Sequence, residues 1–198
     1  MIFEETNLAG VFRILPETHE DERGGFLRTY CRDEFSARGL NPTVAQCSLC
    51  YTHEQGTIRG MHYQIPPAAE AKLVRCIAGS IYDVVIDLRP TSPTYLSHYS
   101  TILSTTERVA LYVPGMCAHG YQALTDGAEV LYQMSEVYKP EFARGVRYDD
   151  PTFAIDWPFV VTHVSVKDRS WPSIEPAIVS SPFAARVAHR RHFMQEVS

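Results

Sequence analysis

Residues 72–88 read KLVRCIAGSIYDVVIDL, two apolar runs on either side of Ala78-Gly79-Ser80. Both runs are rich in Val, Ile, Leu and Tyr, which favour extended structure. Because glycine can adopt a positive φ at a short connection, the pattern predicts two strands joined by a tight hairpin. Similar runs recur outward from this stretch, separated by turn residues. The expected strands cover 27–31, 44–52, 57–63, 72–78, 80–88, 97–104, 108–113 and 129–138.

This many short strands in one chain predicts an all-β fold, a β-barrel or jelly roll. Helical patterns are few: one covers residues 33–38 and another lies near 184–197. Residues 1–172 are expected to form one domain. Residues 173–198 begin with a stretch that contains Pro and Ser, and they are expected to form a C-terminal helical extension on the surface or against a partner subunit.

Composition narrows the class of protein. The chain has 198 residues, 45% of them hydrophobic, which is enough for one domain with a sizeable core. A formal net charge of −5 argues against a nucleic-acid partner. No apolar run approaches the roughly 20 residues that a membrane span needs. Residues 1–5 lack the basic and apolar regions of a signal peptide, so we expect a cytoplasmic protein without a membrane partner.

The five cysteines predict reduced thiols, because their count is odd and no secretion signal is present. Cys47 and Cys50 have the spacing of a zinc or redox pair, but no second pair follows. Both also lie within an expected strand. We interpret the cysteines as small core residues.

Three basic residues with complementary chemistry lie on neighbouring expected strands, in the stretches GTIRGMHYQ (56–64) and KLVR (72–75). The planar fork of Arg59 suits phosphate oxygens. His62 suits proton abstraction near neutral pH, and Lys72 suits a developing enolate oxygen. We expect no acidic residue nearby in sequence to neutralise them. The pattern predicts a phosphate-bearing substrate whose chemistry is proton transfer next to a carbonyl.

Alternation along the expected strands sorts polar side chains onto faces, because residues i and i+2 of a strand share a side. Three such sets are Gln46, Ser48, Cys50 and Thr52; Ile81, Asp83, Val85 and Asp87; and Tyr132, Met134, Glu136 and Tyr138. They are candidates for the lining of a barrel mouth. The alternative for each set is a solvated outer face, and Tyr132 by itself would more simply be a packing residue.

The residues of 56–64 and 72–75 resemble the signature of the dTDP-4-dehydrorhamnose 3,5-epimerases. Further short motifs of that family follow in the same order, and the resemblance covers residues 1–172. They are Asp21-Glu22-Arg23-Gly24-Gly25-Phe26, Asp83 with Asp87-Leu88-Arg89, Ala118-His119-Gly120, Tyr132, Arg144-Gly145-Val146-Arg147, Asp156-Trp157-Pro158 and Ser165-Val166-Lys167-Asp168. Ordered agreement of this kind is specific for the family and less specific for the substrate.

The resemblance implies a cupin-type jelly roll, a homodimer, and neither a metal nor another cofactor. Cupin metal sites usually gather several histidines and a glutamate, often with a His-x-His pair. Here the matching place reads His62-Tyr63-Gln64, and His119 is the single histidine of the second motif. Two histidines are too few for a typical closed metal site. A metal-dependent cupin oxygenase is the alternative enzyme.

The resemblance also implies the catalytic residues. The substrate would be a nucleotide-linked 4-keto-6-deoxyhexose, whose ketone acidifies the hydrogens on C3 and C5. His62 would be the base, and Asp168 would orient it and stabilise its charged form. Lys72 would stabilise the enolate oxygen. Tyr132 would return a proton from the opposite face of the sugar.

Substrate contacts are implied in the same way. Arg59 would hold the diphosphate, and Arg23 and Phe26 would reach the nucleotide from the neighbouring subunit. A second His/Asp set and the polar strand faces complete the candidates for substrate binding, namely His119, Asp83, Gln46, Ser48 and Tyr138.

Several positions depart from the family's common pattern and keep alternatives open. Ser48 stands where many members have Asn, Arg28 where many have Glu, and Met116-Cys117 where Gly-Phe is usual. The expected reaction converts dTDP-4-dehydro-6-deoxyglucose to dTDP-4-dehydrorhamnose. One alternative is a monofunctional 3- or 5-epimerase acting on a CDP- or GDP-linked sugar. Another is a sugar-nucleotide-binding cupin without catalysis.

Overall fold

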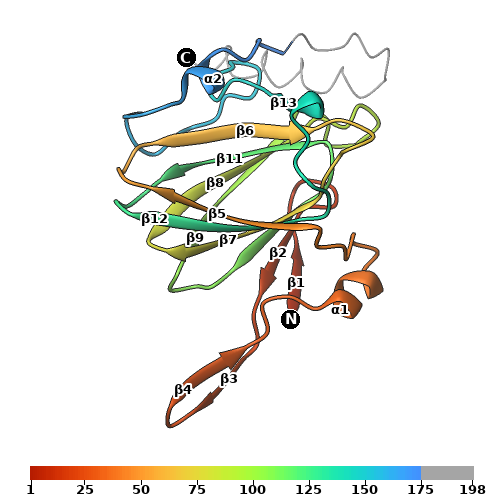
Figure 1. Ribbon diagram of the computed structural model, residues 1–198, viewed down its shortest axis with the longest axis vertical. Coiled ribbons are helices and arrows are strands. Elements are labelled where there is room, and N and C mark those ends of the chain that lie inside the picture. Colours follow the sequence, from red (N-terminus) through yellow and green to blue (C-terminus); the bar gives the residue numbers. More distant parts are fainter. Residues whose placement is uncertain (175–198) are drawn as a thin grey trace, which may run out of the picture.

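The structure, a computed structural model, describes residues 1–174. Two antiparallel sheets face each other, and a two-stranded arm extends away from them (Figure 1). The strands are β1 (Ile2–Glu5), β2 (Phe12–Leu15), β3 (Thr18–Asp21), β4 (Gly24–Leu27), β5 (Gln46–Thr52), β6 (Ile58–Gln64), β7 (Lys72–Ala78), β8 (Ser80–Asp87), β9 (His98–Ser104), β10 (Ala110–Val113), β11 (Cys117–Ala123), β12 (Ala128–Met134) and β13 (Ala143–Gly145). The helical elements are α1 (Arg32–Ala37), the 3₁₀ turn η1 (Pro140–Phe142) and α2 (Val166–Arg169).

The two sheets enclose the main core. One has six strands in the order β1-β2-β10-β7-β12-β5, and the other has five in the order β13-β6-β11-β8-β9. Apolar side chains from both sheets meet in one buried cluster, for example Val74 and Val130 from the six-stranded sheet with Val85 and Tyr121 from the other. Neighbouring strands are mostly distant in sequence, as in a jelly roll. The expected all-β jelly-roll fold is confirmed.

Gly79 joins two strands of different sheets, so the predicted hairpin between 72–78 and 80–88 is wrong. The two edges of β7 pair with β10 and β12, and those of β8 pair with β11 and β9. Gly79 has φ +69°, and a Cβ there would lie 2.2 Å from the Thr125 hydroxyl oxygen. The connection is a sheet-to-sheet corner, because long-range partners occupy both edges of each strand.

The outer face of each sheet is partly covered. Phe35 of α1 packs edge-on against Phe3 and Tyr112, with ring centroids 5.4 and 5.8 Å apart, over the six-stranded sheet. On the five-stranded sheet, Met61 belongs to a second buried cluster with Phe153 of the segment that follows β13. The outer faces of both sheets are therefore partly covered by segments outside the sheets.

The arm formed by β3 and β4 extends from the barrel as a separate ribbon (Figure 1). Its residues are almost all exposed, and Phe26, which lies opposite His19, is 73% exposed. The expected strand 27–31 is wrong, since β4 ends at Leu27 and the chain then leads into α1. An isolated two-stranded ribbon is only marginally stable in water, so this arm is suited to contact another molecule.

The seven remaining expected strands correspond to β5–β10 and β12, and the expected helix 33–38 corresponds to α1. The main omission is β11, which reads CAHGYQA and has few strand-forming residues. It is fully buried at the centre of its sheet, so pairing on both edges outweighs its weak local preference. The expected helix 184–197 lies outside the described residues. Within residues 1–174, no helix is long and apolar enough to cross a membrane.

Candidate active site

A bulge in β6 brings Arg59 and His62 onto the same face of the strand. Residues three apart in a regular strand point to opposite faces. Here His62 lies opposite His119 of β11 and Arg59 lies opposite Tyr121, so three steps along β6 match two along β11. Gly60 lies within this irregularity at φ +132°. Because Tyr121 is part of the core between the sheets, this face points into the barrel.

His62 pairs with a carboxylate from the distant helix α2. Its Nε2 lies 2.6 Å from Oδ1 of Asp168. The Ser165 hydroxyl oxygen caps the helix by accepting a 3.0 Å hydrogen bond from the Asp168 amide. This bond fixes the backbone position from which the Asp168 side chain extends. Burial opposes ionisation of Asp168, but the hydrogen bond and charge of His62 outweigh it and lower the pKa of Asp168. The His62 side chain is 46% exposed, so a ligand can reach it.

A second histidine–carboxylate pair lies deeper in the barrel. His119 Nε2 is 2.8 Å from Oδ2 of Asp83, and both residues are buried. The ring of Tyr132 meets the His119 ring edge-on at a centroid distance of 5.7 Å. Burial raises the pKa of Tyr132 well above its usual value, and Tyr121 and Asp83 add to the shift. Tyr132 therefore keeps its proton at neutral pH.

His62 and Tyr132 come from opposite sheets. His62 belongs to β6 of the five-stranded sheet, and Tyr132 belongs to β12 of the six-stranded sheet. His119 connects them, because it lies opposite His62 in the strand register and also contacts the Tyr132 ring. A ligand between the sheets would have the imidazole on one side and the phenol on the other.

Contacts with β5 hold the Arg59 side chain. Its Nε donates a 3.1 Å hydrogen bond to the Thr52 hydroxyl, and its Nη2 donates one of 3.1 Å to the Tyr51 carbonyl. The Thr52 hydroxyl also lies 2.8 Å from that of Tyr121, which anchors it to the core. Arg59 remains exposed, so its guanidinium is fixed in position yet accessible to an anion.

Lys72 starts β7 on the inner face, opposite Met134 of β12. Its ammonium forms an ion pair with Glu70, and both side chains are buried. The expectation of an unneutralised lysine is therefore wrong. Glu70 lies only two residues before Lys72 in the sequence, and a spacing of two places both side chains on one side of an extended chain.

The polar face of β5 joins the same interior. Ser48 lies opposite Tyr132 in the register, and the Gln46 side-chain amide donates a 3.3 Å hydrogen bond to the Ser48 hydroxyl. Tyr138 does not share a strand face with Tyr132 as predicted, because β12 ends at Met134. Its side chain is exposed, although its amide donates a 2.9 Å hydrogen bond to Gln46 Oε1 and ties it to this end of the barrel.

The structure does not bring Arg23 and Phe26 to His62 within one chain. Both lie on the arm, where Arg23 pairs with Asp21 and its side chain is 84% exposed. Sequence reasoning also missed two residues of the interior, Glu70 and Tyr121. Glu70 could have been found from its spacing to Lys72, whereas Tyr121 lies on the overlooked strand β11.

The grouping of His, Cys, Asp and Glu side chains shows whether the interior could bind a metal ion. In the part of the chain that the structure describes, no group of three or more His, Cys, Asp and Glu side chains could hold a metal ion. Instead, each of the two histidines contacts one aspartate. This arrangement suits acid–base chemistry by paired groups.

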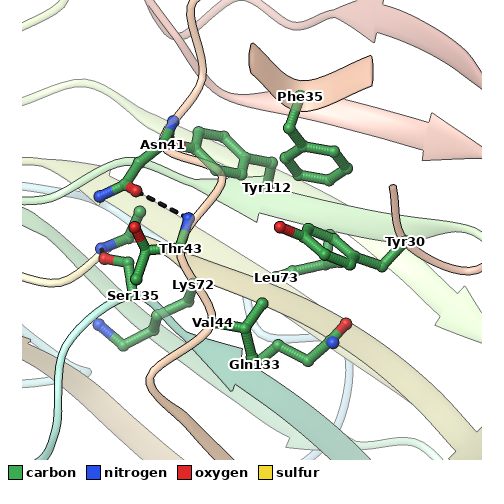
Figure 2. Close-up of a pocket in the computed structure, with 11 residues that line it drawn as sticks. Tyr30, Phe35, Asn41, Thr43, Val44, Lys72, Leu73, Tyr112, Gln133 and Ser135 are labelled. Carbon is green, nitrogen blue, oxygen red and sulfur yellow. Dashed lines mark hydrogen bonds between the residues drawn. The ribbon is translucent and has the colours of Figure 1, made fainter. Parts of the chain in front are cut away.

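A separate hollow lies on the opposite side of β7 (Figure 2). Tyr30, Phe35, Leu73 and Tyr112 line it, next to the turn in which the Thr43 amide bonds to Asn41 Oδ1 at 3.0 Å. Of the predicted site residues, only Lys72 borders it. The hollow is therefore distinct from the barrel interior that holds His62 and Tyr132.

The chain is similar to a set of known enzymes. A family model described as dTDP-4-dehydrorhamnose 3,5-epimerase matches residues 5–176. A relative of that name from Methanothermobacter thermautotrophicus is 38% identical over 85% of this chain and 92% of its own. A dTDP-4-dehydrorhamnose 3-epimerase from Streptomyces niveus is 39% identical over 82% and 78%. The crystal structure of the Bacillus anthracis 3,5-epimerase with TDP and PPi bound aligns with a TM-score of 0.84, at 35% identity over 87% of this chain and 99% of that one.

The protein is a jelly roll in which a histidine of one sheet pairs with an aspartate and the other sheet carries a protonated tyrosine. Together with these relatives, this arrangement defines an isomerase that acts on carbohydrates. The chain belongs to the dTDP-4-dehydrorhamnose 3,5-epimerase family.

Proposed function

We propose that the protein epimerises a nucleotide-linked 4-keto-6-deoxyhexose at C3, C5 or both, with dTDP-4-dehydro-6-deoxyglucose as substrate and dTDP-4-dehydrorhamnose as product. The observation that carries the proposal is the placement of His62 and Tyr132 on opposite sheets across one interior. Inversion of a carbon requires removal of a proton from one face of the sugar and its return to the other. A base and an acid on opposite sheets fit that requirement.

His62 acts as the base. In the tautomer that carries its proton on Nε2, the imidazole donates a hydrogen bond from Nε2 to Asp168. Its lone pair then lies on Nδ1 and can accept a proton from the sugar. The nearby carboxylate then stabilises the imidazolium that forms. The lowered pKa of Asp168 keeps that carboxylate ionised at neutral pH, as this role requires.

Lys72 and Tyr132 complete the proton transfer. Loss of the proton moves negative charge to the C4 oxygen, where the Lys72 ammonium stabilises the enolate. Tyr132 then donates its proton to the carbon from the other face. Burial, which raises the pKa of Tyr132, keeps the phenol protonated at neutral pH, so the proton is present when the enolate forms.

The nucleotide end is held by the remaining candidates. Arg59 binds the diphosphate, since its guanidinium is positioned by β5 and open to an anion. The second pair and the polar residues near β5 contact the sugar and nucleotide, namely His119, Asp83, Gln46, Ser48 and Tyr138. Arg23 and Phe26 reach the site of a partner subunit through the arm, so the active assembly is a homodimer. Cytoplasmic location remains a prediction.

Deuterium exchange tests the proposal. The protein is incubated with dTDP-4-dehydro-6-deoxyglucose in D₂O, and deuterium at C3 and C5 is followed by NMR. The wild type should exchange and invert. His62→Ala should lose both activities by roughly 10²- to 10⁴-fold. Tyr132→Phe should still exchange through the His62 face but invert poorly. Absence of exchange in the wild type with dTDP-, CDP- and GDP-linked substrates would support the non-catalytic alternative.

A second candidate function is epimerisation at C3 alone. The relative from Streptomyces niveus, which is named a 3-epimerase, supports this candidate. The same experiment separates the two, because a 3-epimerase inverts only C3. Exchange at both carbons with inversion at both would exclude it.

A further inference from the structure

The buried ion pair of Glu70 and Lys72 has unused hydrogen-bonding capacity. The side chains of Glu70 and Lys72 are only 7% and 9% exposed. Among the described residues, Glu70 Oε2 has no hydrogen-bond partner, and the Lys72 ammonium contacts Glu70 Oε1 without regular hydrogen-bond geometry. Leaving such groups unsatisfied is costly in a protein interior. An acceptor and a donor therefore remain side by side.

Both groups belong to the interior where the substrate is proposed to bind. Lys72 is on the inner face of β7, opposite Val113 and Met134, and Val113 is part of the core between the sheets. The Glu70 carboxylate forms an ion pair with the Lys72 ammonium, so the two groups lie together.

An adjacent donor and acceptor match a ketone that has a hydroxyl on the neighbouring carbon. The ketone oxygen accepts a hydrogen bond, and the hydroxyl donates one. In a 4-keto-6-deoxyhexose, only the C3 side of the ketone carries a hydroxyl, because C5 carries the methyl group and the ring oxygen. We propose that Glu70 is a substrate-recognition residue that accepts a hydrogen bond from the C3 hydroxyl while Lys72 binds the C4 oxygen. This inference rests on the proposed function.

A hydrogen bond from the C3 hydroxyl to Glu70 also sets the orientation of the sugar in the site. The carboxylate distinguishes the C3 side of the ketone from the C5 side, so the sugar enters with C3 toward β7. A glutamate that served only to neutralise Lys72 would affect every 4-keto sugar equally. A glutamate that binds the hydroxyl affects only sugars that have one, and this difference makes the two roles separable.

The test compares dTDP-4-dehydro-6-deoxyglucose with its 3-deoxy analogue, and kcat/KM is measured as deuterium exchange at the two carbons next to the ketone, which carry hydrogen in both compounds. Sites built to bind a hydroxyl strongly reject analogues without it. The wild type should favour the hydroxylated sugar by about 10²-fold or more. Glu70→Gln should lower that ratio by about tenfold, and Glu70→Ala should bring it close to one.

Asp150→Asn is the matched control, because Asp150 is also a buried carboxylate but bonds to the amides of Thr152 and Ile174 outside the barrel interior. Its substrate ratio should equal that of the wild type. A wild-type ratio near one would overturn the role of Glu70 even if the Glu70 variants fail to fold. A ratio unchanged in a folded Glu70→Gln variant would overturn it as well. A wild type that exchanges neither compound would instead refute the proposed function.

Discussion

Gly60 of β6 and Gly120 of β11 lie in such close backbone contact that a Cβ on Gly60 would be 2.5 Å from the Gly120 Cα. A Cβ on Gly120 would in turn be 2.9 Å from the Gly60 Cα. This contact lies in the irregular part of the β6–β11 pairing, between the rows of His62 and Arg59. The two glycines therefore allow the bulge that points both site residues into the barrel.

Substitution of Gly60 should destabilise the fold and disrupt the site. Gly60→Ala adds a Cβ that meets backbone atoms, and it forces a non-glycine residue to φ +132°. Overpacking and backbone strain each cost about 1–3 kcal/mol, and the free energy of unfolding in urea measures their sum. Gly24→Ala is the matched control, because Gly24 has φ +130° with no atom within 4 Å of the added Cβ. Equal losses in the two variants would show that the contact with Gly120 is unimportant.

The pair of Asp168 and His62 should stabilise the fold in a pH-dependent way. The pKa of Asp168 is lowered from 3.8, so the unfolded chain binds the proton more readily, and the stabilisation is present above about pH 4 and lost as pH falls further. Asp168→Asn should therefore cost about 1–3 kcal/mol at pH 7 and much less near pH 3. Urea unfolding at both pH values measures this, and a cost independent of pH would contradict it.

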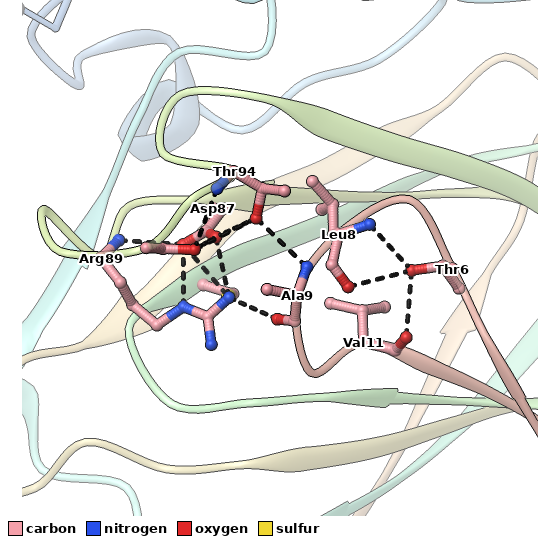
Figure 3. Close-up of polar contacts among 9 residues, drawn as sticks. Thr6, Leu8, Ala9, Val11, Asp87, Arg89 and Thr94 are labelled. Atoms are coloured by element: carbon pink, nitrogen blue, oxygen red, sulfur yellow. Dashed lines mark hydrogen bonds and ion pairs between the residues drawn. The ribbon is translucent and has the colours of Figure 1, made fainter. Parts of the chain in front are cut away.

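Asp87 should be important for stability, because it connects the end of β8 to the N-terminal turn (Figure 3). It accepts 2.8 Å hydrogen bonds from both Nε and Nη2 of Arg89 and one of 2.6 Å from Thr94, whose hydroxyl also accepts from the Ala9 amide. Burial opposes its ionisation, yet these bonds lower the pKa of Asp87. Asp87→Asn should cost about 3 kcal/mol in urea unfolding, because it leaves a partly buried Arg89 unpaired.

The control for Asp87 is Asp149→Asn, which removes a partner of Arg147 from a more exposed pair. Exposed ion pairs contribute about 0–1 kcal/mol, so this change should have little effect. Equal costs for the two aspartates would show that burial of Asp87 does not matter.

Sites shared between subunits should be restored in mixed dimers. An Arg23→Ala chain lacks the arm residue, and a His62→Ala chain lacks the base, but a mixed dimer has one intact site. Equal mixing after unfolding and refolding should restore about a quarter of wild-type sites, since half the dimers are mixed and each has one intact site of two. Native mass spectrometry verifies the mixing. No activity in verified mixed dimers would exclude shared sites.

Activity should be independent of metal ions. The site residues are proposed to move protons through His62 and Tyr132 and to stabilise charge through Lys72, so no step requires a metal. Dialysis against a strong chelator should leave kcat unchanged. A loss of turnover that zinc, iron or manganese restores would contradict this mechanism.

Local patterns predicted the strands but not their partners. Alternating apolar residues in 72–78 and 80–88 indicate strands because burial on one side of a strand is visible in the sequence itself. That these two runs belong to different sheets depends on pairing with β10, β12, β11 and β9, which lie elsewhere in the chain. The strand β11 was missed for the same reason, because its stability comes from its neighbours and not from its composition.

The sequence by itself determined the family and the chemical groups available, because ordered short motifs retain His62, Lys72, Tyr132 and Asp168. Only the tertiary structure decided how those groups meet. His62 and Asp168 are 106 residues apart and come together at 2.6 Å through the packing of α2 near β6. The bulge at Gly60 was equally invisible, since strand register arises from contacts between distant segments.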